Sequence, residues 1–334
     1  MNLKFIRKTT LLASILTLFI LMLGAYTRLS DAGLGCPDWP GCYGKLVVPS
    51  GAEGLARANE LYPDKPLEPS KAWIEMLHRY AAGILGLVIL FITSFIVKNR
   101  KLSGIGHNMY LALLILVVVI FQALLGMWTV TQLVKPTIVT LHLLGGVTTV
   151  SLLWFLYLRL RNTQLTTKQK NHGTLPTLAV IGIFLLLGQI ALGGWVSTNY
   201  AALACVDFPG CYQGKFFPDW NLTEAFSFNL ADGVNYEGGI FANDTRATIH
   251  MLHRIGAVII FLYFSIFSLI AIKLKRSEIT MQVIVLISVL LIQLLLGISN
   301  VIFSLPLPVA VLHNGAAAVL LLVIITIAYS VKAS

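Results

Sequence analysis

The sequence predicts an all-α membrane protein in which eight transmembrane helices form two pseudo-symmetric four-helix bundles. Three observations lead to this fold class: the composition, the spacing of apolar runs and an internal repeat. The chain has 334 residues, of which 57% are hydrophobic and only 11% charged, and its mean hydropathy is +0.82. Average soluble domains are about 25% charged, so a lipid bilayer must cover part of this apolar surface.

Eight apolar runs are long enough to span a bilayer, which takes about 20 residues. We expect helices near 9–28, 73–97, 108–131, 137–158, 174–198, 246–272, 280–303 and 308–331. The first run has the basic start of a signal peptide. No small-residue cleavage site follows it, however, and it has a counterpart inside the chain, so we interpret it as a transmembrane helix.

The net charge of +10 is concentrated at the N-terminus and in short gaps between apolar runs. Cytoplasmic loops are enriched in Lys and Arg, so these gaps and both termini are predicted to be cytoplasmic, in an inner membrane. We expect no nucleic-acid partner, because each basic cluster adjoins a membrane-length run. The clusters are Lys4, Arg7 and Lys8; Lys98, Arg100 and Lys101; Arg159, Arg161, Lys168 and Lys170; and Lys273, Lys275 and Arg276.

An internal repeat divides the chain into an N-terminal half, 1–165, and a C-terminal half, 166–334. The blocks LGAYTRLSDAGLGCPDWPGCYGK, MLHR, QALLGMWTV and TLHLLGG recur as LGGWVSTNYAALACVDFPGCYQGK, MLHR, QLLLGISNV and VLHNGAA. Each half holds four helices, an even number, so both enter the membrane in the same sense, related by a pseudo-two-fold axis along its normal.

Two long polar segments, about 29–71 and 199–245, fall on the outer side and are expected to be loops with short helices. Their parts 45–71 and 215–245 are longer than a minimal loop requires. They are either lids over the two sites or contacts for a partner protein, and the sequence favours neither.

Four histidines occupy matching places in the repeat: His78 and His142 in the first half, and His253 and His313 in the second. Each is expected roughly 8–12 Å inside the outer end of its helix. Two imidazoles at one depth on parallel helices of a bundle can bind one haem iron from both sides. For a lone histidine, a hydrogen bond to a neighbouring helix would be the better interpretation.

Small residues follow each of these histidines, and either make room for a macrocycle or let the helices pack closely. Both interpretations stand. The residues are Gly83, Gly86, Gly145, Gly146, Gly256, Gly315 and Ala316 to Ala318. The two histidines at the cytoplasmic interface, His107 and His172, have no matching partner and are expected to be surface residues.

The halves differ one turn before the first histidine of each pair, where Glu75 is the equivalent of His250. The i, i+3 spacing places Glu75 on the face of His78. Glu75 is either an acid–base group beside the molecule that His78 binds or a solvated carboxylate at the membrane edge. We favour the first interpretation, because only one half carries the acid.

Arg79 and Arg254 directly follow the histidines. Each is interpreted equally well as a contact to a haem propionate or as a side chain that extends to the lipid headgroups.

All four cysteines lie in the outer segments, as C-P-D-W-P-G-C and C-V-D-F-P-G-C. In an oxidising compartment they are expected to form the disulfides Cys36–Cys42 and Cys205–Cys211. The spacing does not match a zinc site or a C-x-x-C motif. We interpret the second bridge as a loop staple, whereas the first is either a staple or a redox-active pair.

Together these residues resemble the haem A synthase family. The E-x-x-H of Glu75 and His78, the H-R of His253 and Arg254, and the paired outer cysteines carry the resemblance, which extends from Leu23 to His313.

The resemblance implies oxidation of the C8 methyl of haem O to a formyl group, by successive hydroxylations and loss of water. It implies that His253 and His313 hold a permanent haem b, that His78 and His142 border the haem O site, and that Glu75 is the catalytic acid. Possible partners are the haem O-forming enzyme and oxidase assembly factors. The alternative is a bis-histidine membrane cytochrome b that carries electrons between quinol and a partner, but it leaves Glu75 without a task. A transporter or a disulfide-forming oxidase would leave the histidines unexplained.

Overall fold

The computed structural model describes residues 3–102, 104–161, 173–212, 214–274 and 277–333. Among them, eight helices are long and apolar enough to cross a membrane, which confirms the predicted fold class. They are α1 (Leu3–Leu29), α3 (Pro69–Lys98), α4 (Met109–Thr131), α5 (Pro136–Arg161), α6 (Thr174–Thr198), α8 (Asn243–Lys273), α9 (Ser277–Ile302) and α10 (Leu307–Ala333). Three short helices accompany them in the described ranges: α2 (Gly51–Leu61), η1 (Gly106–Asn108) and α7 (Leu222–Ala225).

The helix boundaries agree with the sequence to within a few residues. α1 begins six residues earlier than expected and takes in basic residues at its start. α3 begins four residues early because Pro69 stands in its first turn, where the missing N–H and fixed φ suit a helix start. α8 begins at Asn243, and Asp244 in its first turn favours the positive end of the helix dipole.

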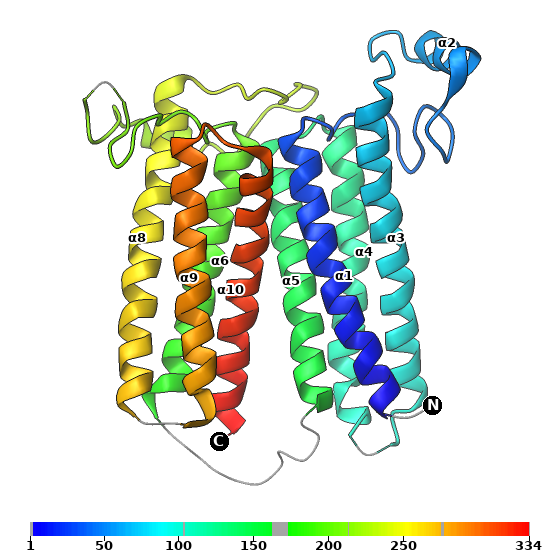
Figure 1. Ribbon diagram of the computed structural model, residues 1–334. Coiled ribbons are helices and arrows are strands. Elements are labelled where there is room, and N and C mark those ends of the chain that lie inside the picture. The colour runs from blue at the N-terminus through cyan, green and yellow to red at the C-terminus, as the bar shows by residue number, and fades with distance from the viewer. Residues whose placement is uncertain (1–2, 103, 162–172, 213, 275–276, 334) are drawn as a thin grey trace.

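The eight helices form two rings, side by side in Figure 1. In the first, α1 contacts α3, α3 contacts α4, α4 contacts α5, and α5 contacts α1. In the second, α6, α8, α9 and α10 close in the same order. The rings meet where α1 contacts α10 and where α6 contacts α5, which are equivalent pairs of the repeat. The expected boundary between residues 165 and 166 lies outside the described residues, as do Lys168, Lys170, His172, Lys275 and Arg276.

The buried apolar side chains of the first ring gather toward its inner part. Ile6, Ile92, Leu153 and Leu156 belong to one cluster, whose buried members in α3 begin only at Leu85, beyond the outer third of the helix. Hydroxyl groups of α1 at this depth donate to the carbonyl four residues earlier, so they do not remain unpaired in the bilayer. His78 in α3 and His142 in α5 lie nearer the outer ends of their helices than these residues do.

Both long polar segments lie at the end of the molecule opposite the two termini (Figure 1). The first, 30–68, contains α2 and packs on α3 of its own half. The second, 199–242, contains α7 and reaches the other half, where Tyr236 N–H donates to the carbonyl of Leu133 over 3.1 Å. Lys135 and Asp232 form an ion pair of 2.7 Å at the same place. The expected short helices are thus confirmed, and the second segment also fastens the two rings together.

Candidate functional site

The structure brings the four candidate histidines together as two pairs. His78 on α3 and His142 on α5 have ring centroids 6.4 Å apart, with ring planes at 82°. His253 on α8 and His313 on α10 repeat this arrangement at 6.5 Å and 80°. The two helices of each pair lie across the ring from one another, so each pair spans the interior of a bundle.

The pairs fit an iron porphyrin. Metal–imidazole bonds are about 2 Å long and a ring nitrogen lies about 1 Å from its centroid, so a metal between two coaxial imidazoles needs centroids about 6 Å apart. The observed separations match this value. Buried polar atoms normally have partners, yet Nδ1 of His78, His142 and His313 is buried with no hydrogen-bond partner.

Each histidine ring packs against a glycine of a neighbouring helix. An added Cβ would lie 2.9 Å from Cε1 of His78 at Gly24, and 3.4 Å from Cε1 of His142 at Gly126. The corresponding distances in the second half are 3.1 Å from His253 at Gly193 and 3.1 Å from His313 at Gly297. These glycines leave room for the rings: a Cβ at Gly24 would displace the imidazole, one at Gly193 or Gly297 would require a small shift, and one at Gly126 would be close to ordinary contact.

Sequence reasoning missed these four glycines, although the repeated blocks contained the signal. Gly24 and Gly193 are 169 residues apart, like the equivalent cysteines, and Gly126 and Gly297 are 171 apart, like His142 and His313. The glycines that the sequence singled out behave differently. Gly145 and Gly256 pack against glutamine side chains, Gly146 against Leu21 and Gly315 against Met22, whereas Gly83 and Gly86 have no such neighbour within 4 Å.

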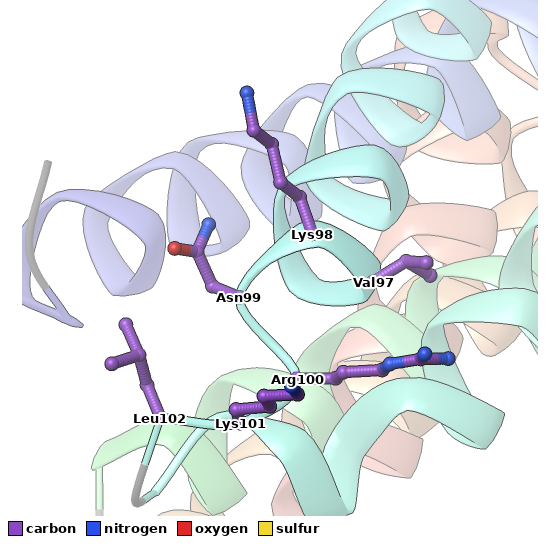
Figure 2. Close-up of a pocket in the computed structure, with 6 residues that line it drawn as sticks. All are labelled: Val97, Lys98, Asn99, Arg100, Lys101 and Leu102. Atoms are coloured by element: carbon purple, nitrogen blue, oxygen red, sulfur yellow. The ribbon is translucent and has the colours of Figure 1, made fainter.

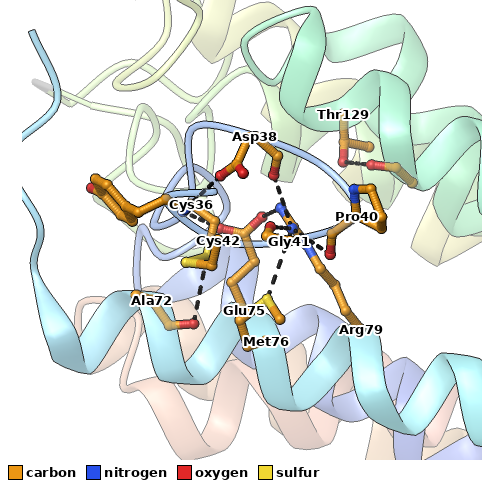
Figure 3. A network of polar contacts seen from close by, with 12 residues as sticks. Cys36, Asp38, Pro40, Gly41, Cys42, Ala72, Glu75, Met76, Arg79 and Thr129 are labelled. Atoms are coloured by element: carbon orange, nitrogen blue, oxygen red, sulfur yellow. Dashed lines mark hydrogen bonds and ion pairs between the residues drawn. A yellow bond between two sulfur atoms is a disulfide. The ribbon is translucent and has the colours of Figure 1, made fainter. Parts of the chain in front are cut away.

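Glu75 lies in the middle of a polar network that joins α3 to the first disulfide loop (Figure 3). Glu75 is 4% exposed, which excludes the alternative of a solvated carboxylate. One carboxylate oxygen accepts the backbone N–H of Cys36 over 2.8 Å. The other pairs with Arg79 over 2.5 Å. Charge-assisted contacts of this kind are short and strong, so they fix the carboxylate one turn outward of His78.

The two arginines hold the disulfide loops. Arg79 Nη1 donates to the carbonyls of Asp38, at 3.0 Å, and Gly41, at 2.5 Å. Arg254 Nη1 donates to the equivalent carbonyls of Asp207 and Gly210, at 2.9 Å and 2.7 Å. Neither interpretation from the sequence included these contacts, because they depend on the path of a loop about 40 residues earlier in the chain.

His250 takes the place of Glu75 in the second half. It is 5% exposed, and its Nε2 accepts a hydrogen bond of 3.3 Å from Arg254 Nε. Arg254 Nη2 donates instead to the carbonyl of Cys205 over 2.7 Å. The arginine clamp is therefore shared by both halves, while the buried carboxylate belongs to the first half alone among the described residues.

Both expected disulfides are formed, Cys36–Cys42 and Cys205–Cys211, and all four cysteines are fully buried. The first loop is further ordered by Asp38, whose carboxylate accepts the N–H of Tyr43 over 2.6 Å. Burial raises the pKa of the Tyr43 hydroxyl, which donates to the carbonyl of Lys65. The loop next to Glu75 is thus a rigid part of the site.

The opposite end of the molecule contains a hollow of about 560 Å³, lined by Val97 to Leu102. Lys98, Arg100 and Lys101 extend from this turn in different directions (Figure 2). They form one of the predicted basic clusters, and no candidate site residue lines the hollow. His107, near this end, is exposed as expected.

The fold and the buried histidine pairs define a multi-pass membrane protein whose bundle interiors suit a metalloporphyrin. The chain belongs to the COX15-CtaA family of cytochrome oxidase assembly proteins, whose model matches residues 7–325.

Individual relatives agree with this assignment. The chain is 44% identical to a heme A synthase of Shewanella oneidensis over 330 residues, which covers 98% of this chain and 96% of the relative. It is 25% identical to a heme A synthase of Rickettsia felis over an alignment that covers 100% of both chains. A heme A synthase of Bacillus licheniformis is 28% identical over 62% of this chain and 64% of its own length.

Proposed function

We propose that this protein is a haem A synthase that oxidises the C8 methyl of haem O to a formyl group. The observation that carries the proposal is the buried carboxylate of Glu75 next to one of two equivalent histidine pairs. The family membership supports the same conclusion.

In this proposal His253 and His313 hold a resident haem b, and His78 and His142 border the haem O substrate. Haem b supplies one-electron transfer when it is bound. The bundle sets the separation of the two imidazoles in each pair, at 6.4 Å and 6.5 Å between ring centroids. The assignment of one pair to cofactor and the other to substrate follows Glu75, which lies only on the side of His78.

Conversion of the methyl group passes through a hydroxymethyl group and a geminal diol, which loses water to leave the formyl group. Written with water as the source of the oxygen, each hydroxylation removes two electrons and two protons from the substrate, and the electrons leave to an external one-electron acceptor. The Cys36 N–H and Arg79 hold the carboxylate of Glu75 in one orientation. There it is placed to accept these protons or to stabilise positive charge that develops on the substrate.

Arg79 and Arg254 remain proposed propionate contacts, in addition to their bonds to the disulfide loops. The protein is proposed to lie in the inner membrane with both termini in the cytoplasm, because the basic clusters gather at the end where the termini lie. Docking of the haem O-forming enzyme or of oxidase assembly factors is proposed for the opposite, outer end.

The test is to produce the protein together with a source of haem O and to analyse the extracted haems by chromatography. We expect haem b together with haem A or its hydroxymethyl intermediate. Haem b with unchanged haem O would favour the alternative, a membrane cytochrome b that carries electrons. A purified protein without a Soret band would reject both haem functions.

A further inference from the structure

The two histidine pairs differ in how the first histidine of each is supported. Gly24 on α1 and Gly193 on α6 are equivalent, and each contacts the imidazole of its own half. One turn further inward on the same helix faces, the repeat carries Ile20 in the first half and Gln189 in the second. This substitution changes the atoms next to the ring.

Gln189 contacts His253 at two points. Its Nε2 lies 3.0 Å from Nδ1 of the imidazole and donates to the backbone carbonyl of the same residue over 2.9 Å. In the first half the side chain of Ile20, which is buried at 7% exposure, has no polar atom, and Nδ1 of His78 has no side-chain hydrogen-bond partner. Among the four paired histidines, only His253 has a hydrogen-bonding side chain at Nδ1 in the described part of the chain.

A second difference accompanies the first. Gly256 lies beside Gln189, and a Cβ at Gly256 would come within 2.1 Å of the amide oxygen. The equivalent of Gly256 in the first half is Ala81, which packs against the apolar cluster that contains Ile20. In the second half, Gly256 leaves room for the amide of Gln189, whereas the first half has Ala81 and Ile20 at these places. The residues at the two positions therefore differ together between the halves.

We infer that Gln189 is a positioning residue for His253. This inference rests on the proposed function, and it explains why the second pair is the site of the resident haem. A metal-bound imidazole that uses Nε2 carries its proton on Nδ1, and a partner at Nδ1 fixes the ring and its tautomer. In the structure the amide nitrogen of Gln189 faces Nδ1; a half-turn of the amide presents its oxygen instead, which accepts the Nδ1 proton and gives up the bond to the His253 carbonyl. His253 is held in place before haem binds, which favours retention.

The first pair lacks this support at His78, which suits a site where haem must enter as haem O and leave as haem A. Loss of a hydrogen-bonding partner behind a metal ligand typically lowers metal affinity about 10- to 100-fold. The difference between Gln189 and Ile20 is thus large enough to separate a resident cofactor from an exchanging substrate.

The experiment uses the purified holoprotein in detergent micelles. We would measure four properties: the amount of haem b per protein, the rate of haem loss to apomyoglobin, the reduction potential of haem b and its low-temperature EPR spectrum. Q189I, and Q189I combined with G256A to copy the packing of the first half, are both expected to speed haem loss about tenfold or more. Q189E is expected to restore retention and lower the potential, because a carboxylate accepts the Nδ1 proton more strongly. Q282L, a change at an inner-end glutamine of α9 that bonds Ser330, is the matched control.

Unchanged haem loss, potential and EPR spectrum in the double variant would overturn the inference, and so would a wild-type protein without haem b. Failure of the proposed function has a different signature. If haem O is never converted but Q189I still loosens haem b, the positioning role stands and the synthase activity does not. Reciprocally, I20Q is expected to slow haem exchange in the first half without altering the spectrum of haem b.

Discussion

The two halves share a framework and differ in one reactive group. In each half an arginine after the histidine clamps a disulfide loop through equivalent carbonyls. One turn outward of the histidine, however, Glu75 in the first half is replaced by His250 in the second. The contacts between the arginine and the disulfide loop are thus the same in both halves, whereas the buried acid is present in one. Because the loop is held without an acid in the second half, Glu75 is not needed for this structural role, which indicates a chemical role.

The outer segments differ as well. The first packs mainly on its own half, with Val48, Ala58 and Leu67 against the start of α3, and meets the other half near its beginning, where Asp31 accepts a hydrogen bond from Tyr200 over 2.9 Å. The second lies partly across the first half, where Tyr236 and Leu230 pack with Val134. The half proposed to handle the substrate is therefore covered by a segment of the half proposed to hold the cofactor.

The strongest test of this comparison is E75Q, which keeps the size of the side chain and removes its charge. We expect haem A formation to fall about 100- to 10,000-fold, the usual contribution of an acid–base group. The haem b content should not change, because Glu75 lies in the other half. Chromatography of extracted haems measures both, and E68Q, at a largely exposed carboxylate, is the control. Turnover within a few-fold of wild type would remove Glu75 from the mechanism.

Replacing each arginine by methionine separates the clamp from the ion pair. Both R79M and R254M remove the bonds to a disulfide loop, but only R79M leaves a buried carboxylate without its cation. We expect R79M to lower the free energy of unfolding by about 3 kcal/mol, and R254M by less. Thermal unfolding in micelles gives the order, with R57M on the exposed face of α2 as the control. Equal losses would mean that the ion pair adds nothing to the clamp.

The disulfides offer a comparison with matched loop lengths. Both bridges close six-residue separations, so replacing either pair with serine should lower stability by a similar amount, about 2 kcal/mol. Only the first loop donates an N–H to Glu75. Loss of Cys36–Cys42 should therefore also lower haem A formation about tenfold, as expected for a bond to a charged group. If both double variants lower activity equally, the first bridge is only a staple.

The glycines at the histidine rings give a smaller effect. G193A places a Cβ 3.1 Å from Cε1 of His253, and G24A places one 2.9 Å from Cε1 of His78. Alanine favours the helix by up to about 1 kcal/mol, while overpacking costs about 1–3 kcal/mol, so the net loss should be about 1 kcal/mol. G193A should change the EPR spectrum of haem b, whereas G24A should change only turnover. G188A, which has no neighbour within 4 Å, should change neither.

The sequence predicted the helices well because the bilayer imposes a length on each apolar run and backbone groups must be paired within it. It also predicted the two histidine pairs, since depth follows from helix direction. The hydrogen bonds from Arg79 to the first disulfide loop were not predicted, and neither were the contacts of the second outer segment with the first half. Both depend on the paths of long polar segments, which carry no periodic pattern.

The glutamine contact to His253 can be traced in the sequence only when the two repeats are compared position by position. The exchange of Gln189 and Gly256 for Ile20 and Ala81 becomes meaningful only when the structure shows that Gln189 and Gly256 touch and that Ile20 and Ala81 belong to one apolar region. Helical periodicity gives the face on which a residue lies, but it does not give the neighbouring helix that it meets.

The smallest predicted effect concerns the ion pair that joins the halves. Lys135 and Asp232 are 2.7 Å apart, but the side chain of Asp232 is 87% exposed, so water and salt screen the attraction. A double-mutant cycle with K135A and D232N should give a coupling of less than about 1 kcal/mol, and added salt should reduce it further. A larger coupling that persists in high salt would mean that this contact, rather than the packing around Tyr236, holds the second outer segment on the first half.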